Sequence, residues 1–278
     1  MTTSQATRPD VVVARGSRAR RGHLGVVLPT LVLPALVLVV WQLASWVFAP
    51  REWILPSPAL IARTAWDDRA RLWYHAEWTL LVTVLGLGLA IAVGCLLAFL
   101  IARSRLANLA LYPWVVATQT IPLVALAPLF VLWMPAFAAM VSLAALISIF
   151  PVIVAGVDGL RAGDPDLVRA VRALGADPGW VWWHVRIPAA LPRLFTGIRM
   201  AAVFAVTGAV VGELVASDRG LGALTRLSAG QFETAVTFAG VACLAIIGLT
   251  LFATVALAEH LALPYLRRPT RPSSARNS

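Results

Sequence analysis

Long apolar segments separated by short charged segments dominate the sequence. Six of the apolar segments contain about 20 or more residues, the length that an α-helix needs to cross the hydrocarbon core of a bilayer. We expect these spans near residues 26–49, 79–102, 109–132, 136–157, 195–216 and 236–263. The pattern therefore predicts an all-α integral membrane protein with six transmembrane helices.

The apolar segment 26–49 follows a basic tail and is longer than the apolar core of a cleavable signal peptide. We therefore expect it to remain in the mature protein. The expected organisation is a cytoplasmic tail at 1–25, a six-helix membrane domain at 26–263 and a second cytoplasmic tail at 264–278. The longest loop of this domain covers about 158–194, between the fourth and fifth spans.

Arginine supplies all 23 basic residues, and the formal net charge is +10. The arginines lie between the apolar segments and form no single basic face, which argues against a nucleic-acid partner. With both termini in the cytoplasm, the inner segments hold 17 arginines. The outer segments then hold six: Arg51, Arg63, Arg69, Arg71, Arg219 and Arg226. The positive-inside rule thus predicts a multi-pass plasma membrane protein with cytoplasmic termini.

The outer segment 49–77 balances four arginines against four acidic residues. We interpret it as a short surface helix. Tryptophans suited to the membrane–water interface lie in and beside it: Trp53, Trp66, Trp73 and Trp78.

Small residues recur every four positions in the second span, at Gly86, Ala90, Gly94, Ala98 and Ala102. This stripe predicts close contact with another helix. Proline interrupts the third and fourth spans at Pro113, Pro122, Pro128 and Pro151. These prolines predict kinks, either for packing or for a bundle that bends around a route.

Polar residues at membrane depth are few: Thr118, Gln119, Thr120 and Glu213. An unpaired amide or carboxylate is costly in hydrocarbon, so we expect these side chains to face the bundle interior or a water-filled route. They are candidate route residues. Two simpler alternatives stay open, in which Gln119 bonds a neighbouring helix and Glu213 lies in the interface.

The sequence contains no GxxxxGK[ST] phosphate loop, no HExxH, no GxSxG and no cluster of His and carboxylates at metal-ligand spacing. Cys95 and Cys243 both fall inside apolar segments, where a small buried hydrophobic role is expected. We therefore expect no catalytic residue, no metal and no cofactor bound by this chain.

The stretch RAVRALGADPGWVWWHVRIPAALP lies in the long loop. Asp164 and Pro165 indicate a helix start, and Gly175 indicates its end. Its apolar face comprises Leu167, Val168, Val171 and Leu174. A second start at Asp177 and Pro178 predicts a helix that Pro188 ends. The tryptophans could anchor this helix–turn–helix in the headgroup layer, or the turn could dock a cytoplasmic partner.

The same stretch resembles the permease subunits of binding-protein-dependent ABC importers. Their loop pattern is EAA, three residues, G, nine residues, I, one residue, LP. It falls here on Arg169, Ala170, Val171, Gly175, Val185, Ile187 and Pro188. Glycine, proline and spacing match, whereas Arg169 replaces the family glutamate and Val171 the second alanine.

Other elements are similar to the nitrate, sulfonate and taurine group of these permeases. They are the LPSP sequence at 55–58, the third-span residues Ile121, Pro122, Ala125, Pro128, Leu129 and Trp133, and Glu213 followed by Gly220, Leu221 and Gly222. The glycine-rich turn that the family has after its third span is reduced here to Met134 and Pro135.

The resemblance implies a homodimer or a paired half-transporter that forms a route for a small solute by alternating access. It also implies cytoplasmic ATPase subunits that bind ATP and Mg²⁺, an extracytoplasmic solute-binding protein and surrounding membrane lipids. The implied coupling residues are Arg169, Ala170, Val171, Leu174, Gly175, Ala176, Val185, Ile187 and Pro188. Nitrate, alkanesulfonates, taurine and a pyrimidine-like precursor all stay open as solutes. The alternatives are an ion-coupled secondary transporter and a membrane-bound scaffold or enzyme.

Overall fold

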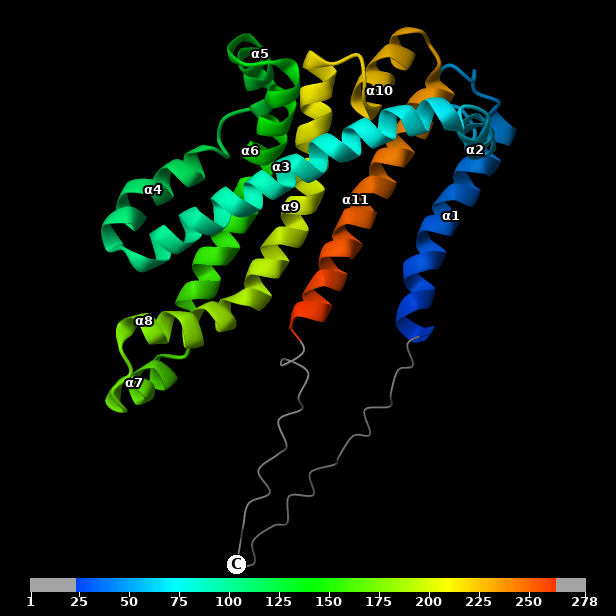
Figure 1. The fold of residues 1–278 in the computed structure, drawn as a ribbon. Coiled ribbons are helices and arrows are strands. Elements are labelled where there is room, and N and C mark those ends of the chain that lie inside the picture. The colour runs from blue at the N-terminus through cyan, green and yellow to red at the C-terminus, as the bar shows by residue number, and fades with distance from the viewer. Residues whose placement is uncertain (1–23, 264–278) are drawn as a thin grey trace, which may run out of the picture. The chain divides into compact units, whose positions relative to one another are not determined.

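The computed structural model describes residues 24–263, and all regular structure in this range is helical (Figure 1). The tails expected at 1–25 and 264–278 lie almost wholly outside the described residues. The chain divides into two units after Ala49. The first contributes one described helix, α1 (Leu24–Phe48), and its side chains from Val32 to Phe48 are mostly exposed within the isolated chain.

The second unit begins at Pro50 and carries all the other helices. They are α2 (Pro58–Asp67), α3 (Arg69–Arg103), α4 (Arg105–Ala117), α5 (Leu123–Trp133), α6 (Ala136–Arg161), α7 (Pro165–Ala173), α8 (Pro178–Val181), the π-turn η1 (Trp182–Arg186), α9 (Ile187–Ala216), α10 (Leu221–Gly230) and α11 (Thr234–Ala262).

Four helical stretches of the described chain are long and apolar enough to cross a membrane. They are α3, α6, α11 and the continuous run from Pro178 to Ala216. Val32–Phe48 and Val124–Trp133 are shorter apolar helices. An all-helical membrane protein is therefore confirmed. Four stretches reach full span length among the described side chains, and the six spans expected from the sequence stay a prediction.

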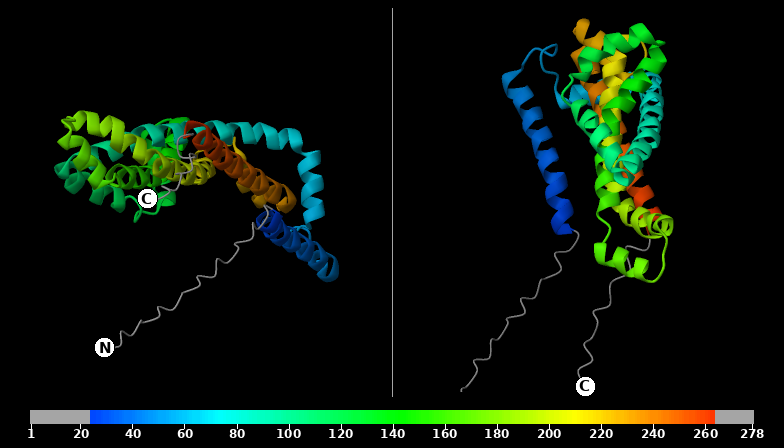
Figure 2. Two further views of the ribbon diagram at one scale, coloured as in Figure 1. Left: turned by 90° about the horizontal axis from the view of Figure 1, so that it is seen from below. Right: turned by 90° about the vertical axis from the view of Figure 1, so that its left-hand side faces the viewer.

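Helices α3, α6 and α9 pack against one another along the centre of the second unit, as Figures 1 and 2 show. The predicted small-residue stripe of α3 forms part of this contact. A Cβ atom added to Gly94 would lie 2.8 Å from Val152 Cγ1, and one added to Gly156 would lie 2.7 Å from Ala98 Cβ. Only small residues permit such an approach, which strengthens van der Waals packing between helices.

The third expected span is not one helix. Helix α4 ends at Ala117, and α5 begins at Leu123 with Pro122 as its N-cap. At the break, the hydroxyl groups of Thr118 and Thr120 donate hydrogen bonds to Val115 O (2.7 Å) and Ala117 O (2.8 Å). Pro122 lacks a backbone donor and restricts the residue before it, so the helix stops where a continuous span was expected.

The outer segment 49–77 also differs from the prediction. Only α2 is a separate helix there, with Ser57 Oγ accepting a hydrogen bond from Leu60 N (3.2 Å). From Arg69 onward the chain already belongs to α3, which is therefore longer at its N-terminal end than the expected span. The first turns of α3 contain charged residues but no proline. Charged side chains are compatible with a helix, so α3 extends beyond the apolar segment.

Pro188 does not end a helix. Backbone N–H of Ile187 bonds to Trp182 O in a π-turn, and Pro188 occupies the first turn of α9. A proline needs no backbone donor in a first helical turn, and the wider π-turn precedes it. The helical stretch therefore continues from the loop into the membrane-length helix.

Candidate functional site

The loop between α6 and α9 contains the short helix α7, whose start is as the sequence predicts. Asp164 is the N-cap, its Oδ1 accepts a hydrogen bond from Asp166 N (2.9 Å), and Pro165 takes the first helical position. Arg169 pairs with Asp166 on the exposed face of α7. The guanidinium that replaces the family glutamate is thus engaged within its own helix.

Gly175 terminates α7 in the left-handed region, with φ +92°. Gly175 N donates to Arg172 O (3.0 Å), and Ala176 N donates to Val171 O (3.1 Å). These two bonds form a Schellman motif, which satisfies carbonyl groups at the helix end. A residue with a Cβ would be strained at this φ, so glycine fixes the sharp turn into α8.

Asp177 caps α8 by accepting a hydrogen bond from Trp180 N (3.0 Å). Trp180 stacks on His184 with ring centroids 4.5 Å apart, whereas Trp182 contacts Phe99 of α3 at 5.6 Å. Val181 is fully buried between these contacts. The second half of the loop is therefore fastened to α3 through Trp182.

The tip of the loop is apolar and open. Leu174 is 88% exposed, the largest exposure of any large hydrophobic residue among the described side chains. A hollow of about 430 Å³ adjoins it and is lined by Val171, Leu174, Gly175, Ala176, Asp177 and Trp180. Four predicted coupling residues meet here, while Val185, Ile187 and Pro188 lie in the π-turn and the start of α9.

The four predicted route residues do not lie together. Thr118, Gln119 and Thr120 form the break between α4 and α5, where Gln119 Nε2 donates to Thr118 Oγ1 (3.4 Å). Glu213 lies in α9, fully buried, and its Oε2 accepts a hydrogen bond from Gly222 N (2.8 Å) at the start of α10. In this structure its carboxylate thus faces the start of α10.

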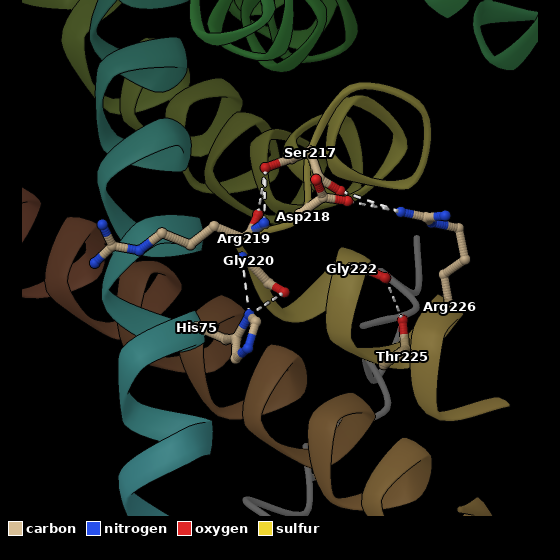
Figure 3. A network of polar contacts seen from close by, with 8 residues as sticks. All are labelled: His75, Ser217, Asp218, Arg219, Gly220, Gly222, Thr225 and Arg226. Atoms are coloured by element: carbon tan, nitrogen blue, oxygen red, sulfur yellow. Dashed lines mark hydrogen bonds and ion pairs between the residues drawn. The ribbon is translucent and has the colours of Figure 1, made fainter. Parts of the chain in front are cut away.

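A polar cluster around Glu213 joins α3, the loop after α9 and α10, and Figure 3 shows part of it. His75 Nδ1 lies 2.9 Å from Gly220 O and 3.1 Å from Gly220 N. Thr79 Oγ1 accepts a hydrogen bond from Leu221 N (2.8 Å). These backbone groups are buried. Thr79 satisfies Leu221 N, and His75 Nδ1 satisfies one of the two Gly220 groups, since a ring nitrogen either donates or accepts.

Arg219 joins the same loop to α3 at the surface of the protein. Its guanidinium lies 4.2 Å from the ring centroid of Tyr74 and 4.9 Å from that of Trp78, and it pairs with Glu77 at 2.7 Å. Sequence reasoning missed this cluster and His75. The only local signal was the GLG sequence, because His75 and Gly220 are separated by 145 positions.

A second hollow lies between the ends of α6 and α9 nearest the loop. Its volume is about 610 Å³, and its lining comprises Ala155, Asp158, Arg161, Ala162, Arg193 and Thr196. Two arginines and one aspartate give this opening a net positive lining. The exposed side chains of α9 continue from it along one helical face, at Arg193, Thr196, Met200, Phe204 and Thr207.

An ion pair between α9 and α11 was also missed. Arg199 lies 3.3 Å from Glu259, and both side chains are mostly buried. Arg199 additionally lies over the ring of Phe252. Both residues sit in predominantly apolar helices, and an opposite charge on a neighbouring helix is how such a group is commonly accommodated.

Comparison with known proteins identifies the class. The family described as "Binding-protein-dependent transport system inner membrane component" matches residues 90–263. The formylaminopyrimidine transport permease protein ThiX of Halalkalibacterium halodurans is 33% identical over 83% of this chain and 92% of its own. The riboflavin transport system permease protein RibX of Chloroflexus aurantiacus is 39% identical over 80% and 84%. The taurine transport system permease protein TauC of Escherichia coli is 32% identical over 76% and 77%.

The chain therefore belongs to the inner membrane components of binding-protein-dependent transport systems. Within that class it is a permease subunit of an ABC importer for a small solute. A chain of an inward-facing MetNI methionine ABC transporter shares the fold, with TM-score 0.59 over 69% of this chain and 97% of that chain at 18% identity. The sequence-based family assignment is confirmed.

Proposed function

We propose that the loop tip around Leu174 and Gly175 docks into a cytoplasmic ATPase and couples ATP hydrolysis to solute import. The observation that carries this proposal is the 88% exposure of Leu174 on a loop whose other half is fastened to the bundle. An apolar side chain on a rigid turn fits a groove in a partner. ATP and Mg²⁺ bind to that partner in this proposal, and this chain binds neither.

Rigid connection explains how movement of the tip reaches the membrane. The stretch from Pro178 to Ala216 is continuously helical, and α9 packs along α6. A force on α8 therefore moves α9 and its packed partner largely as rigid bodies. ATP-driven closure of the ATPase pair then changes the side from which the route is open.

The route itself is proposed to lie along the exposed face of α9, between two copies of this chain. Thr196 and Thr207 place hydroxyl groups on that face, and it ends at the hollow of about 610 Å³. Thr118, Gln119 and Thr120 are retained as route candidates at the break between α4 and α5. A conformation in which Glu213 reaches the route would require α10 to separate from α9.

The proposed topology has six spans, α1, α3, the broken pair α4 and α5, α6, α9 and α11, with the loop and both termini in the cytoplasm. The excess of arginine in the inner segments supports this orientation. An extracytoplasmic binding protein delivers the solute in this arrangement. Trp66 and Trp73, both 70% exposed, then lie at the outer membrane–water interface.

The proposed solute is a small molecule of the nitrate, sulfonate or taurine type, which carries a nitrate or sulfonate group. Arg161 and Arg193 against the single Asp158 at the hollow support an anionic cargo. The names of the relatives ThiX and RibX favour a second candidate, a nitrogen heterocycle. Uptake of labelled taurine, measured with unlabelled formylaminopyrimidine and riboflavin as competitors, separates the two.

Co-purification tests the docking proposal. The tagged wild-type chain should retain a P-loop ATPase, and Leu174→Asp should lose it because a charge would be buried in an apolar groove. Leu174→Met conserves volume and should keep the ATPase. Since Leu174 contacts little of its own chain, both variants should reach the membrane in equal amounts. Equal ATPase retention by Leu174→Asp and the wild type would overturn the docking role.

A further inference from the structure

An apolar cavity lies between α3, α6 and α9, close to the loop. Its volume is about 150 Å³, and its lining comprises Cys95, Ala98, Phe99, Gly156, Leu160, Ile187, Ala190, Leu191 and Leu194. Four of these residues are small, so the helices leave a space that their own side chains do not fill. This cavity is separate from both hollows described above.

The chemistry of the lining determines what can occupy the cavity. It presents methyl, methylene and aromatic groups and one thiol, with no carboxylate, amine or guanidinium that would hold water. Apolar protein cavities of about 150 Å³ stay dry and take up an apolar group of about six carbon atoms. A hydrocarbon segment is therefore the occupant that this lining favours.

Two arginines lie beside the rings at the loop end of the cavity. Phe99, which lines it, contacts Trp182 with ring centroids 5.6 Å apart. The guanidinium carbon of Arg103 lies 6.0 Å from the centroid of Phe99, and that of Arg186 lies 4.9 Å from the centroid of Trp182. Each ring of the Phe99–Trp182 pair thus has one arginine guanidinium beside it.

The charges of Arg103 and Arg186 are not neutralised by any acidic side chain among the described residues. None of the ion pairs found among residues 24–263 involves either guanidinium. Arg103 is exposed at the last residue of α3, and Arg186 is half-buried at the last residue of the π-turn. Each guanidinium carries several donors that suit phosphate oxygens.

We propose that this place is a binding site for one anionic glycerophospholipid. Part of an acyl chain fills the cavity, and the phosphate lies between Arg103 and Arg186. An apolar cavity joined to two unneutralised cations at a helix end matches the two parts of such a lipid, and basic pockets between membrane helices are suited to lipid headgroups. Under the proposed orientation the lipid belongs to the inner leaflet.

The position of the site assigns the lipid a role. It contacts the end of α3, the end of α6 and the start of α9 together, immediately beside the π-turn that joins the loop to α9. A bound lipid would therefore strengthen the contact of the loop-bearing helix with α3. We expect anionic lipid to raise the thermal stability of the full-length chain even when no ATPase is present.

Native mass spectrometry of the delipidated full-length chain tests the proposal. Phosphatidylglycerol and phosphatidylcholine with identical acyl chains are titrated separately. The proposal predicts at least five-fold tighter binding of phosphatidylglycerol, and that glycerol phosphate alone does not displace it. Equal affinities for the two lipids, or displacement by glycerol phosphate, would overturn it.

Variants locate the site. Arg103→Gln combined with Arg186→Gln should reduce phosphatidylglycerol binding to the phosphatidylcholine level, whereas Arg169→Gln combined with Arg172→Gln on α7 should leave it unchanged.

Cys95→Leu fills the cavity and should weaken the binding of both lipids, whereas Cys243→Leu, on α11, should not. Unchanged binding in the first double variant or in Cys95→Leu would contradict the proposal. Because lipid binding is measured without ATPase or solute, its failure leaves the transport proposal untouched.

Discussion

The carboxylate of Glu213 in α9 accepts a hydrogen bond from the backbone N–H of Gly222, with 2.8 Å between Oε2 and N. Both residues are buried, and Gly222 lies in the first turn of α10. The carboxylate thereby satisfies a backbone donor that has no partner within its own helix. The carboxyl oxygen therefore acts as an acceptor at the N-terminal end of α10, where backbone donors are free of intrahelical partners. This hydrogen bond joins the C-terminal part of α9 to the start of α10.

Removal of the Glu213 side chain should therefore loosen this end of the bundle. Glu213→Ala leaves the Gly222 N–H buried and unpaired, which costs about 1–3 kcal/mol. Glu213→Gln keeps an oxygen that can accept the same bond, so it should lose less stability. Thermal unfolding of the purified variants measures the difference. Equal melting temperatures for the two variants would contradict the role of this bond.

Gly220 should be intolerant of any side chain. Its φ is +114°, and an added Cβ would fall on the carboxyl group of Glu213. Gly220→Ala should therefore be poorly expressed or markedly less stable than the wild type. Gly230 ends α10 with open space around it and provides the control, since Gly230→Ala should retain wild-type expression. Expression and melting temperature in detergent check both variants.

The contact of α6 with α9 depends on a glycine that admits the facing backbone. A Cβ on Gly208 would lie 2.6 Å from Ala144 Cα and 2.8 Å from Leu143 O. Gly208→Ala should cost about 1–3 kcal/mol through overpacking. Gly88 of α3 has nothing within 4 Å of the corresponding position, so Gly88→Ala should be neutral or slightly stabilising. A Gly208→Ala variant as stable as Gly88→Ala would show that the helices can separate without cost.

The pair of Arg199 and Glu259 should show measurable coupling between α9 and α11. Each single change, Arg199→Gln or Glu259→Gln, leaves one charged group mostly buried without its partner. The double variant should recover part of the loss, with a coupling energy of about 0.5–3 kcal/mol in a double-mutant cycle. Strictly additive losses would indicate that the two groups are solvated independently.

Gly175 should be required for the shape of the loop tip. Gly175→Val places a β-branched residue at φ +92°, and we expect it to reach the membrane but to lose solute uptake. Asparagine enters the left-handed region more readily, so Gly175→Asn should keep substantial uptake. Uptake per amount of membrane-inserted protein is the measurement. Normal uptake by Gly175→Val would remove the requirement for this turn.

Features determined within a few residues were predictable from the sequence. Asp164 and Asp177 cap their helices, and Gly175 closes the Schellman motif, because each signal and its hydrogen-bond partner lie close together in the chain. The stripe containing Gly94 was predictable for a related reason, since helical periodicity alone places its members on one face.

Features that depend on distant partners were not predictable. Arg199 is acceptable in an apolar helix because Glu259 faces it, and His75 gains its role from Gly220. The helix continues through Pro188 because a π-turn precedes this proline. Trp182, the first residue of the π-turn, packs its ring on Phe99 of α3. No periodicity in the sequence records these contacts, because they arise from how separate helices approach one another.

The most direct test of the central claim is solute uptake into sealed vesicles that contain this chain and its co-purified ATPase, with the binding protein supplied outside. The account predicts that uptake requires ATP hydrolysis, persists without any ion gradient and stops in Leu174→Asp. Uptake that continues with a non-hydrolysable ATP analogue and follows an imposed proton or sodium gradient would contradict it.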